Sequence, residues 1–314
     1  MTPPESTPPV EPRHDSAVEI LYRPAALLSM RPKTRGAYTQ HRNIVYAEAC
    51  GTGLIMDVFY PLRNASGRAV VDVIGSGWMA DRIALNEHIG LGSVDALCDR
   101  GLTVFAVSPG SVSLFTGLQM VHHVHAALRH IKHHDADYGI HPRRIGILGA
   151  SAGGHLAAMA ALTPQPGHPA ARPPWRRWAT DVAAVAVLFP PTDLVEYGSA
   201  RFDQIQVEGF DPGRLLFRDG LDGKSEAEIL EKLKALSPAR LPVSTPPPFM
   251  IVQGKKDPIV PWEQAEKLAA ALRRAGGTAT VQYHETGGHP WPDIHKDIGD
   301  MACWLDEMLG AVPA

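Results

Sequence analysis

Residues 144–154, RIGILGASAGG, carry the strongest indication of the fold. Arg144–Leu148 is a short apolar run typical of a buried strand, and the small residues of Gly153–Leu162 favour a helix directly after it. Between them, GASAG fits the pattern G-x-S-x-G, in which a sharp strand-to-helix turn exposes the serine oxygen. A helix start with an incidental serine is the alternative. The flanking strand and helix favour Ser151 as a nucleophile at the carboxyl end of a sheet strand.

Seven further short runs surround this stretch and have the composition of strands. They are Ile44–Glu48, Leu54–Tyr60, Ala69–Ile74, Leu102–Val107, Ala183–Phe189, Phe249–Val252 and Thr278–Tyr283. Gly-Thr-Gly at 51–53 joins the first two as a hairpin, and segments with helical periodicity separate most of the others. The pattern predicts an α/β fold with a mostly parallel, eight-stranded sheet and helices on both faces.

The chain is expected to form one domain. Residues 1–40 are predicted to be an N-terminal tail, whose first 15 residues are proline-rich and expected to be disordered. The domain then covers 41–314. Residues 193–247 interrupt the alternation of strands and helices and read as a small lid-like insertion, with one expected helix at Ser225–Leu236.

Composition excludes several classes of protein. The 30 basic and 33 acidic residues leave a net charge of −3, so we expect no nucleic-acid or membrane partner. Three cysteines, Cys50, Cys98 and Cys303, lack the spacing of a disulfide framework or a thiolate zinc site. No signal peptide is recognised, which favours a cytoplasmic location. The oligomeric state is left open.

A serine hydroxyl needs a base to act as a nucleophile, and in this kind of fold the order along the chain is serine, acid, histidine. Asp257 follows the run Phe249–Val252, and His289 follows the run Thr278–Tyr283. Both would therefore reach the sheet edge that carries Ser151. Asp257 could instead be an ordinary turn aspartate. The competing residues are Asp193 for the acid, and His284 and His295 for the base.

Acyl transfer also needs backbone N–H groups that stabilise a developing oxyanion. The loop Ile74-Gly75-Ser76-Gly77-Trp78 follows the third strand, and its small residues would let the backbone approach a substrate closely. We expect the oxyanion hole to consist of the N–H groups of Ser76, Gly77 and Ala152. Trp78 is expected either to bind substrate as a wall of the site or simply to pack in the core.

At these residues the sequence resembles the α/β-hydrolase superfamily. The likeness is stronger to its esterase branch with an H-G-G-x-W oxyanion loop, which includes hormone-sensitive-lipase-like, acetyl-xylan/feruloyl-esterase-like and aryl-formamidase-like enzymes. Residues 138–156 and 253–261 carry the likeness almost position by position. The loop departs from the pattern, because Ile74 stands at the histidine and Ser76 at the second glycine. The hydrogen bonds with which that histidine orders the loop would be lost here.

The resemblance implies an α/β-hydrolase fold and a serine esterase that acts through an acyl-enzyme, with no cofactor and no metal. The implied substrates are small acyl esters or carbohydrate-linked and feruloyl-type esters. The same three residues could also serve an arylformamidase or a serine peptidase, and a non-catalytic binding protein could retain the fold. His130 and His134 lie one helical turn apart and could suit a metal, but a solvated helix face is the favoured interpretation.

Overall fold

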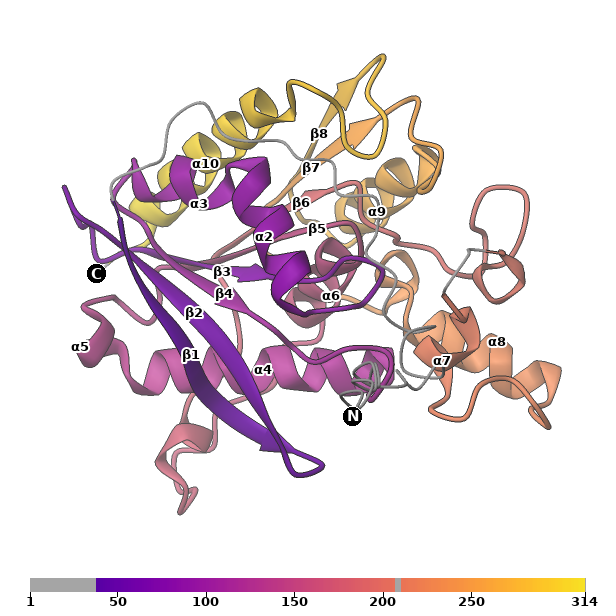
Figure 1. Ribbon diagram of the computed structural model, residues 1–314, viewed down its shortest axis with the longest axis horizontal. Coiled ribbons are helices and arrows are strands. Elements are labelled where there is room, and N and C mark those ends of the chain that lie inside the picture. Colours follow the sequence, from indigo (N-terminus) through magenta and orange to yellow (C-terminus); the bar gives the residue numbers. More distant parts are fainter. Residues whose placement is uncertain (1–37, 207–209, 314) are drawn as a thin grey trace, which may run out of the picture.

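The computed structural model describes residues 38–206 and 210–313. Its centre is an eight-stranded sheet with strand order β1-β2-β4-β3-β5-β6-β7-β8 (Figure 1). The strand β2 is antiparallel to both of its neighbours, and every other pair is parallel. The strands are β1 (Tyr38–Ala49), β2 (Thr52–Pro61), β3 (Ala69–Val73), β4 (Thr103–Val107), β5 (Ile145–Ala150), β6 (Ala184–Leu188), β7 (Phe249–Gly254) and β8 (Ala279–His284). The predicted sheet is confirmed.

Helices cover both faces of the sheet. One face packs against α2 (Arg82–Leu91), α3 (Ser93–Cys98) and α10 (Ile294–Ala311). The other packs against α4 (Gly117–His133), α6 (Ser151–Leu162) and α9 (Glu263–Arg274), and the two layers are visible in Figure 1. The sheet and its helices thus form two hydrophobic clusters, one on each face. Consecutive residues of a strand contribute to opposite clusters because side chains alternate across a strand.

The helix α2 is absent from the sequence-based expectations. Its N-cap is Asp81, whose carboxylate accepts hydrogen bonds from the N–H groups of Ile83 and Ala84. Gly92 ends it in the left-handed conformation. These capping signals are present in the sequence, but the apolar face of α2 is short. A short face of this kind gives only a weak periodic signal.

The predicted insertion lies between β6 and β7. It contains α7 (Pro212–Leu216) and α8 (Glu226–Ala235), which lie together at one end of the molecule in Figure 1. The buried carboxylate of Asp193 anchors the start of the insertion. It lies 2.6 Å from the Arg240 guanidinium and 3.3 Å from the Lys267 ammonium. Burial opposes the ionised form, but the hydrogen bonds and positive charge of these partners hold the pKa of Asp193 below its usual range.

Most of the predicted N-terminal tail, residues 1–37, lies outside the described residues. The last three residues assigned to it, Tyr38–Gln40, belong to β1 instead, so the first strand is longer than its apolar core suggested. The remaining short elements are α5 (Asp135–Tyr138) and three 3-10 turns at Pro174–Arg177, Phe202–Gln204 and Pro238–Arg240. Within residues 38–206 and 210–313, no helix combines the length and apolar character needed to cross a membrane.

Candidate active site

Ser151 is the first residue of α6 and follows β5 without a loop. Its φ is +51°, a left-handed conformation that is strained for a residue with a side chain. The neighbouring glycines are required by close backbone contacts. A Cβ on Gly149 would lie 2.4 Å from the Gly153 carbonyl oxygen, and one on Gly153 would lie 2.1 Å from the carbonyl oxygen of Val73. The tight turn therefore explains the two glycines of the motif.

Three side chains from distant parts of the chain form one hydrogen-bonded line. Ser151 Oγ lies 2.9 Å from His289 Nε2, and His289 Nδ1 lies 2.7 Å from Asp257 Oδ2. A carboxylate only accepts, so Nδ1–H donates to Asp257 and leaves Nε2 to accept the proton of Ser151. The other carboxylate oxygen, Oδ1, accepts from the N–H groups of Ile259 and Val260, each at 2.8 Å. The arrangement matches the geometry of a nucleophile, an oriented base and a buried acid.

The loops that carry the acid and the base lie against each other because β7 and β8 are neighbours. A Cβ on Gly254 would lie 2.4 Å from the Gly287 carbonyl oxygen, so only glycine allows this approach. Phe189, directly after β6, packs its ring 4.2 Å from the ring of His289. Its φ of +37° is unusual for a bulky residue, and no sequence signal could have identified this contact.

The competing acid and one competing base have other partners. Asp193 pairs with Arg240 and Lys267 at the start of the insertion, as described above. His284 ends β8, stacks on Trp291 with 5.0 Å between ring centroids, and lies 3.4 Å from Asp293. Of the predicted residues, the structure therefore joins Asp257 and His289 to Ser151.

The loop after β3 lies on the first turn of α6, where the Gly153 N–H donates to the Gly75 carbonyl oxygen at 3.2 Å. Ser76 and Met79 exchange two backbone hydrogen bonds of 2.9 Å, so the Ser76 N–H is already used within the loop. Gly77 is at the exposed tip, where a Cβ would meet no atom within 4 Å. Ala152 is in the first helical turn, where N–H groups have no intrahelical acceptor. This geometry favours Gly77 and Ala152 over Ser76 as oxyanion donors.

The side chain of Ser76 has a role that the sequence did not suggest. It lies near the carboxyl group of Glu87 on α2, where burial raises the pKa of Glu87 and the Ser76 hydroxyl partly opposes that shift. Ile74 at the loop's start is fully buried in the cluster around α2, α3 and α10.

Trp78 is a packing residue in this structure. Its side chain is only 5% exposed, and its indole Nε1–H donates to Nδ1 of His155 at 3.1 Å. The ring also stacks on Phe210 at 5.5 Å with 18° between the planes. The expectation of a substrate wall therefore does not fit the burial of Trp78, and the packing alternative does.

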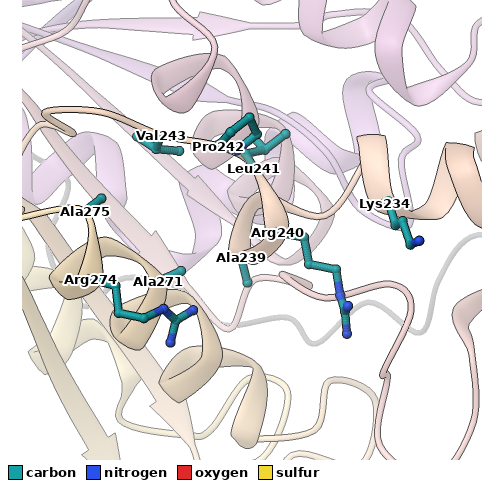
Figure 2. A pocket seen from close by; sticks show the side chains of 9 residues that line it. All are labelled: Lys234, Ala239, Arg240, Leu241, Pro242, Val243, Ala271, Arg274 and Ala275. Atoms are coloured by element: carbon teal, nitrogen blue, oxygen red, sulfur yellow. The ribbon is translucent and has the colours of Figure 1, made fainter.

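Among the described residues, no other serine hydroxyl is hydrogen-bonded to a histidine ring. A groove of about 550 Å³ lies between α8 and α9, with Lys234, Arg240 and Arg274 at its rim (Figure 2). Its lining contains no nucleophile, acid or histidine. In the part of the chain that the structure describes, no three His, Cys, Asp or Glu residues are placed to hold a metal. His130 and His134 contact each other and Tyr138 instead.

The sequence is similar to a known family and to curated proteins named as esterases. The sequence model of the BD-FAE family matches residues 56–272. Esterase LipQ of Mycobacterium tuberculosis is 36% identical over 163 residues, 52% of this chain and 36% of its own length. Acetylxylan esterase of Xylanibacter ruminicola is 24% identical over 263 residues, 80% of this chain and 47% of its own length. The chain spans about half or less of the curated relatives it matches.

Solved structures share the architecture over almost the whole chain. A truncated carbohydrate esterase from gut microbiota superimposes with a TM-score of 0.70 at 23% identity, covering 88% of this chain and 99% of that one. At this identity the likeness concerns the fold, which is the α/β-hydrolase fold with its eight-stranded, mostly parallel sheet.

Proposed function

From the premise that this chain belongs to the BD-FAE family, we propose that it is a serine hydrolase that cleaves carboxylic esters. The observation that carries the proposal is the line of hydrogen bonds from Ser151 through His289 to Asp257. Each of these side chains follows the carboxyl end of a parallel strand, where open α/β sheets bind their ligands. The similarity to proteins named as esterases supports the same chemistry.

In the proposed reaction, Ser151 Oγ attacks the ester carbonyl while its proton passes to Nε2 of His289. The N–H groups of Gly77 and Ala152 stabilise the oxyanion of the tetrahedral intermediate. His289 then returns the proton to the leaving alcohol, and an acyl group remains on Ser151. A water molecule, activated by the same histidine, releases the acid and restores the serine. Asp257 holds the Nδ1–H tautomer and stabilises the imidazolium throughout.

The proposed substrates are small acyl esters, including esters attached to carbohydrates. Two similarities support this class, one to a protein named acetylxylan esterase and one to a carbohydrate esterase of known structure. A cytoplasmic location and independence from nucleic acids and membranes stay predictions from the sequence. Fractionation of cells that express the full chain would test them.

The first experiment is hydrolysis of p-nitrophenyl esters from acetyl to octanoyl by the wild type and by Ser151→Ala. We expect the wild type to turn over short esters fastest and the variant to lose at least ~10³-fold in kcat, because the nucleophile is removed. Activity that persists in the variant would overturn the assignment of Ser151.

A second readout does not depend on the ester chosen. Paraoxon phosphorylates activated serines, so the intact wild type should gain one diethylphosphoryl group, mapped by peptide mass spectrometry to Ser151. Ser151→Ala should gain none. A wild type that neither hydrolyses any ester in the series nor reacts with paraoxon would contradict the proposed function.

A further inference from the structure

His155 is completely buried on α6, one helical turn beyond Ser151, and both of its ring nitrogens are engaged. Nδ1 accepts from the indole N–H of Trp78 at 3.1 Å, and Nε2–H donates to the Leu236 carbonyl oxygen at 2.7 Å. Burial lowers the pKa of His155 to about 4, with the Leu236 hydrogen bond opposing the shift. The ring is therefore neutral at pH 7, with one donor and one acceptor, both used.

The turn that contains Trp78 needs an external support. Residues 76–79 close with two backbone hydrogen bonds, and both central residues are left-handed, with φ of +55° at Gly77 and +59° at Trp78. This is the pattern of a type I′ turn, whose central positions normally hold glycine, asparagine or aspartate. A tryptophan there is strained, so its surroundings must hold it in place.

The contacts of the Trp78 side chain supply that support. The indole is fixed at its N–H by His155, stacks on Phe210 and meets the ring of Phe202 edge to face at 5.2 Å. The backbone carbonyl of Trp78 accepts from the Val112 N–H at 2.9 Å. Among these contacts, the hydrogen bond to His155 is the one that joins the turn directly to the helix that begins with Ser151.

The second partner of His155 is equally well anchored. Leu236 caps the C-terminus of α8 in the insertion, and its carbonyl oxygen receives the Nε2–H of His155. The next residue, Ser237, donates its hydroxyl to the Leu233 carbonyl oxygen at 2.6 Å and accepts from the Leu194 N–H at 2.8 Å. The imidazole thus bridges the nucleophile helix, the oxyanion loop and the insertion.

We propose that His155 is a positioning residue that holds the Trp78 turn, and with it the Gly77 N–H, in the conformation that binds the oxyanion. The inference rests on the proposed function. The proposal also explains how the oxyanion loop is held in place although its first residue, Ile74, has no polar side-chain atom. His155 touches no substrate in this scheme and acts through Trp78.

Two variants test the hydrogen bond between Trp78 and His155. Trp78→Phe removes the indole N–H but keeps an aromatic ring in the stack, and His155→Phe removes both hydrogen bonds but keeps the ring volume. We expect each to lower kcat for p-nitrophenyl acetate by about 10-fold, less than the ~10²–10³-fold loss of a whole oxyanion donor. KM should stay within about twofold, since oxyanion contacts act in the transition state. The double variant should be no slower than the slower single variant.

His125→Phe is the matched control. His125 is buried on α4, and its Nε2 lies 3.0 Å from the Ala160 carbonyl oxygen at the far end of the same helix α6. Its loss removes a buried histidine hydrogen bond to α6 without touching the oxyanion loop. We expect His125→Phe to lower Tm but to keep kcat, whereas Trp78→Phe and His155→Phe lower kcat beyond any effect on Tm.

A readout independent of activity separates this inference from the proposed function. In ¹⁵N NMR spectra of the wild type, His155 should show the neutral Nε2–H tautomer from pH 5 to 8, and Trp78→Phe should shift its Nδ1 resonance. The inference is overturned if Nδ1 does not respond, or if Trp78→Phe keeps kcat within twofold. It is also overturned if the two losses in kcat multiply in the double variant. If His155→Phe does not fold, the kcat and the Nδ1 resonance of Trp78→Phe still test the inference.

Discussion

Of the four aspartate–histidine pairs among the described residues, two have a fully buried carboxylate, and these two lie in very different places. Asp257 and His289 lie 2.7 Å apart beyond the ends of β7 and β8, and the imidazole is 11% exposed. Asp72 and His88 lie 2.9 Å apart between β3 and α2, with both side chains almost completely buried. One pair with a buried carboxylate thus lies at the sheet edge, and the other lies within the protein interior.

The position of the third partner separates the two pairs. Ser151 meets the free nitrogen of His289, so a proton can move from the serine to the base. The Ser93 hydroxyl instead lies 3.1 Å from the carboxylate of Asp72 and 3.1 Å from the His88 carbonyl oxygen, and its one proton is shared between these two acceptors. The buried pair therefore joins β3, α2 and α3. An aspartate–histidine pair can therefore serve as a base where it lies at the carboxyl edge of the sheet beside a serine hydroxyl, and not through the geometry of the pair alone.

The largest expected effect is on the pair at the site. Asp257→Asn should lower kcat by about 10⁴-fold, because the amide no longer holds His289 in the tautomer that accepts the serine proton. Steady-state kinetics on p-nitrophenyl acetate would measure it. Asp193→Asn, which changes the other carboxylate that follows a strand, should keep kcat within a few-fold. Equal losses of kcat in the two variants would contradict the assignment of Asp257, and not Asp193, as the acid that orients His289.

Substitutions in the buried pair of Asp72 and His88 should change the stability of the protein and leave kcat unchanged. At pH 6, below the raised pKa of His88, Asp72→Asn breaks a buried ion pair and should lower the free energy of unfolding by about 3–5 kcal/mol. Asp219→Asn removes an exposed partner of Lys224 and should leave the free energy of unfolding almost unchanged, because water screens exposed ion pairs. Urea unfolding compares the two variants. A folded Asp72→Asn protein with kcat lowered as far as in Asp257→Asn would remove the distinction between the pairs.

The buried pair also predicts a dependence of stability on pH. Burial opposes the charged form of His88, but the charge and hydrogen bond of Asp72 raise its pKa above the ordinary value of 6.5. A raised folded-state pKa stabilises the protein fully below the unfolded-state value and loses that contribution as pH rises through the folded-state value. The stability advantage of wild type over His88→Gln should therefore shrink above about pH 6.5. Unfolding at pH 6 and pH 9 measures it, and an advantage that grows with pH would contradict the charged pair.

A smaller loss of stability than that of Asp72→Asn is expected at Ser93, the serine of the buried pair. Ser93→Ala removes a hydrogen bond to a buried carboxylate and should cost about 1.5–3 kcal/mol of stability with kcat unchanged. Ser151→Ala should do the reverse, because its hydroxyl lies in a partly open site. Thermal unfolding and ester hydrolysis of both variants, measured in parallel, would show whether Ser93→Ala lowers only stability and Ser151→Ala lowers only kcat.

Much of the fold could be read from local sequence. All eight strands were predicted, because runs such as Ile145–Leu148 are apolar on both faces of a covered sheet. Helix α2 escaped prediction, since its apolar face is short. The two closely packed loops at Gly254 and Gly287 could not be anticipated either, because their contact arises only when β7 and β8 pair.

The order of the strands along the chain and the nucleophile turn follow from local sequence, because strand composition and the need for glycines beside Ser151 are local properties. That Asp257 and His289 meet Ser151, while Asp193 and His284 pair elsewhere, is set by the three-dimensional packing. It likewise decided that Trp78 packs in the core and that the Ser76 N–H is used within its own turn. These outcomes depend on distances between segments far apart in the chain, which strand order and helix packing set and local sequence does not.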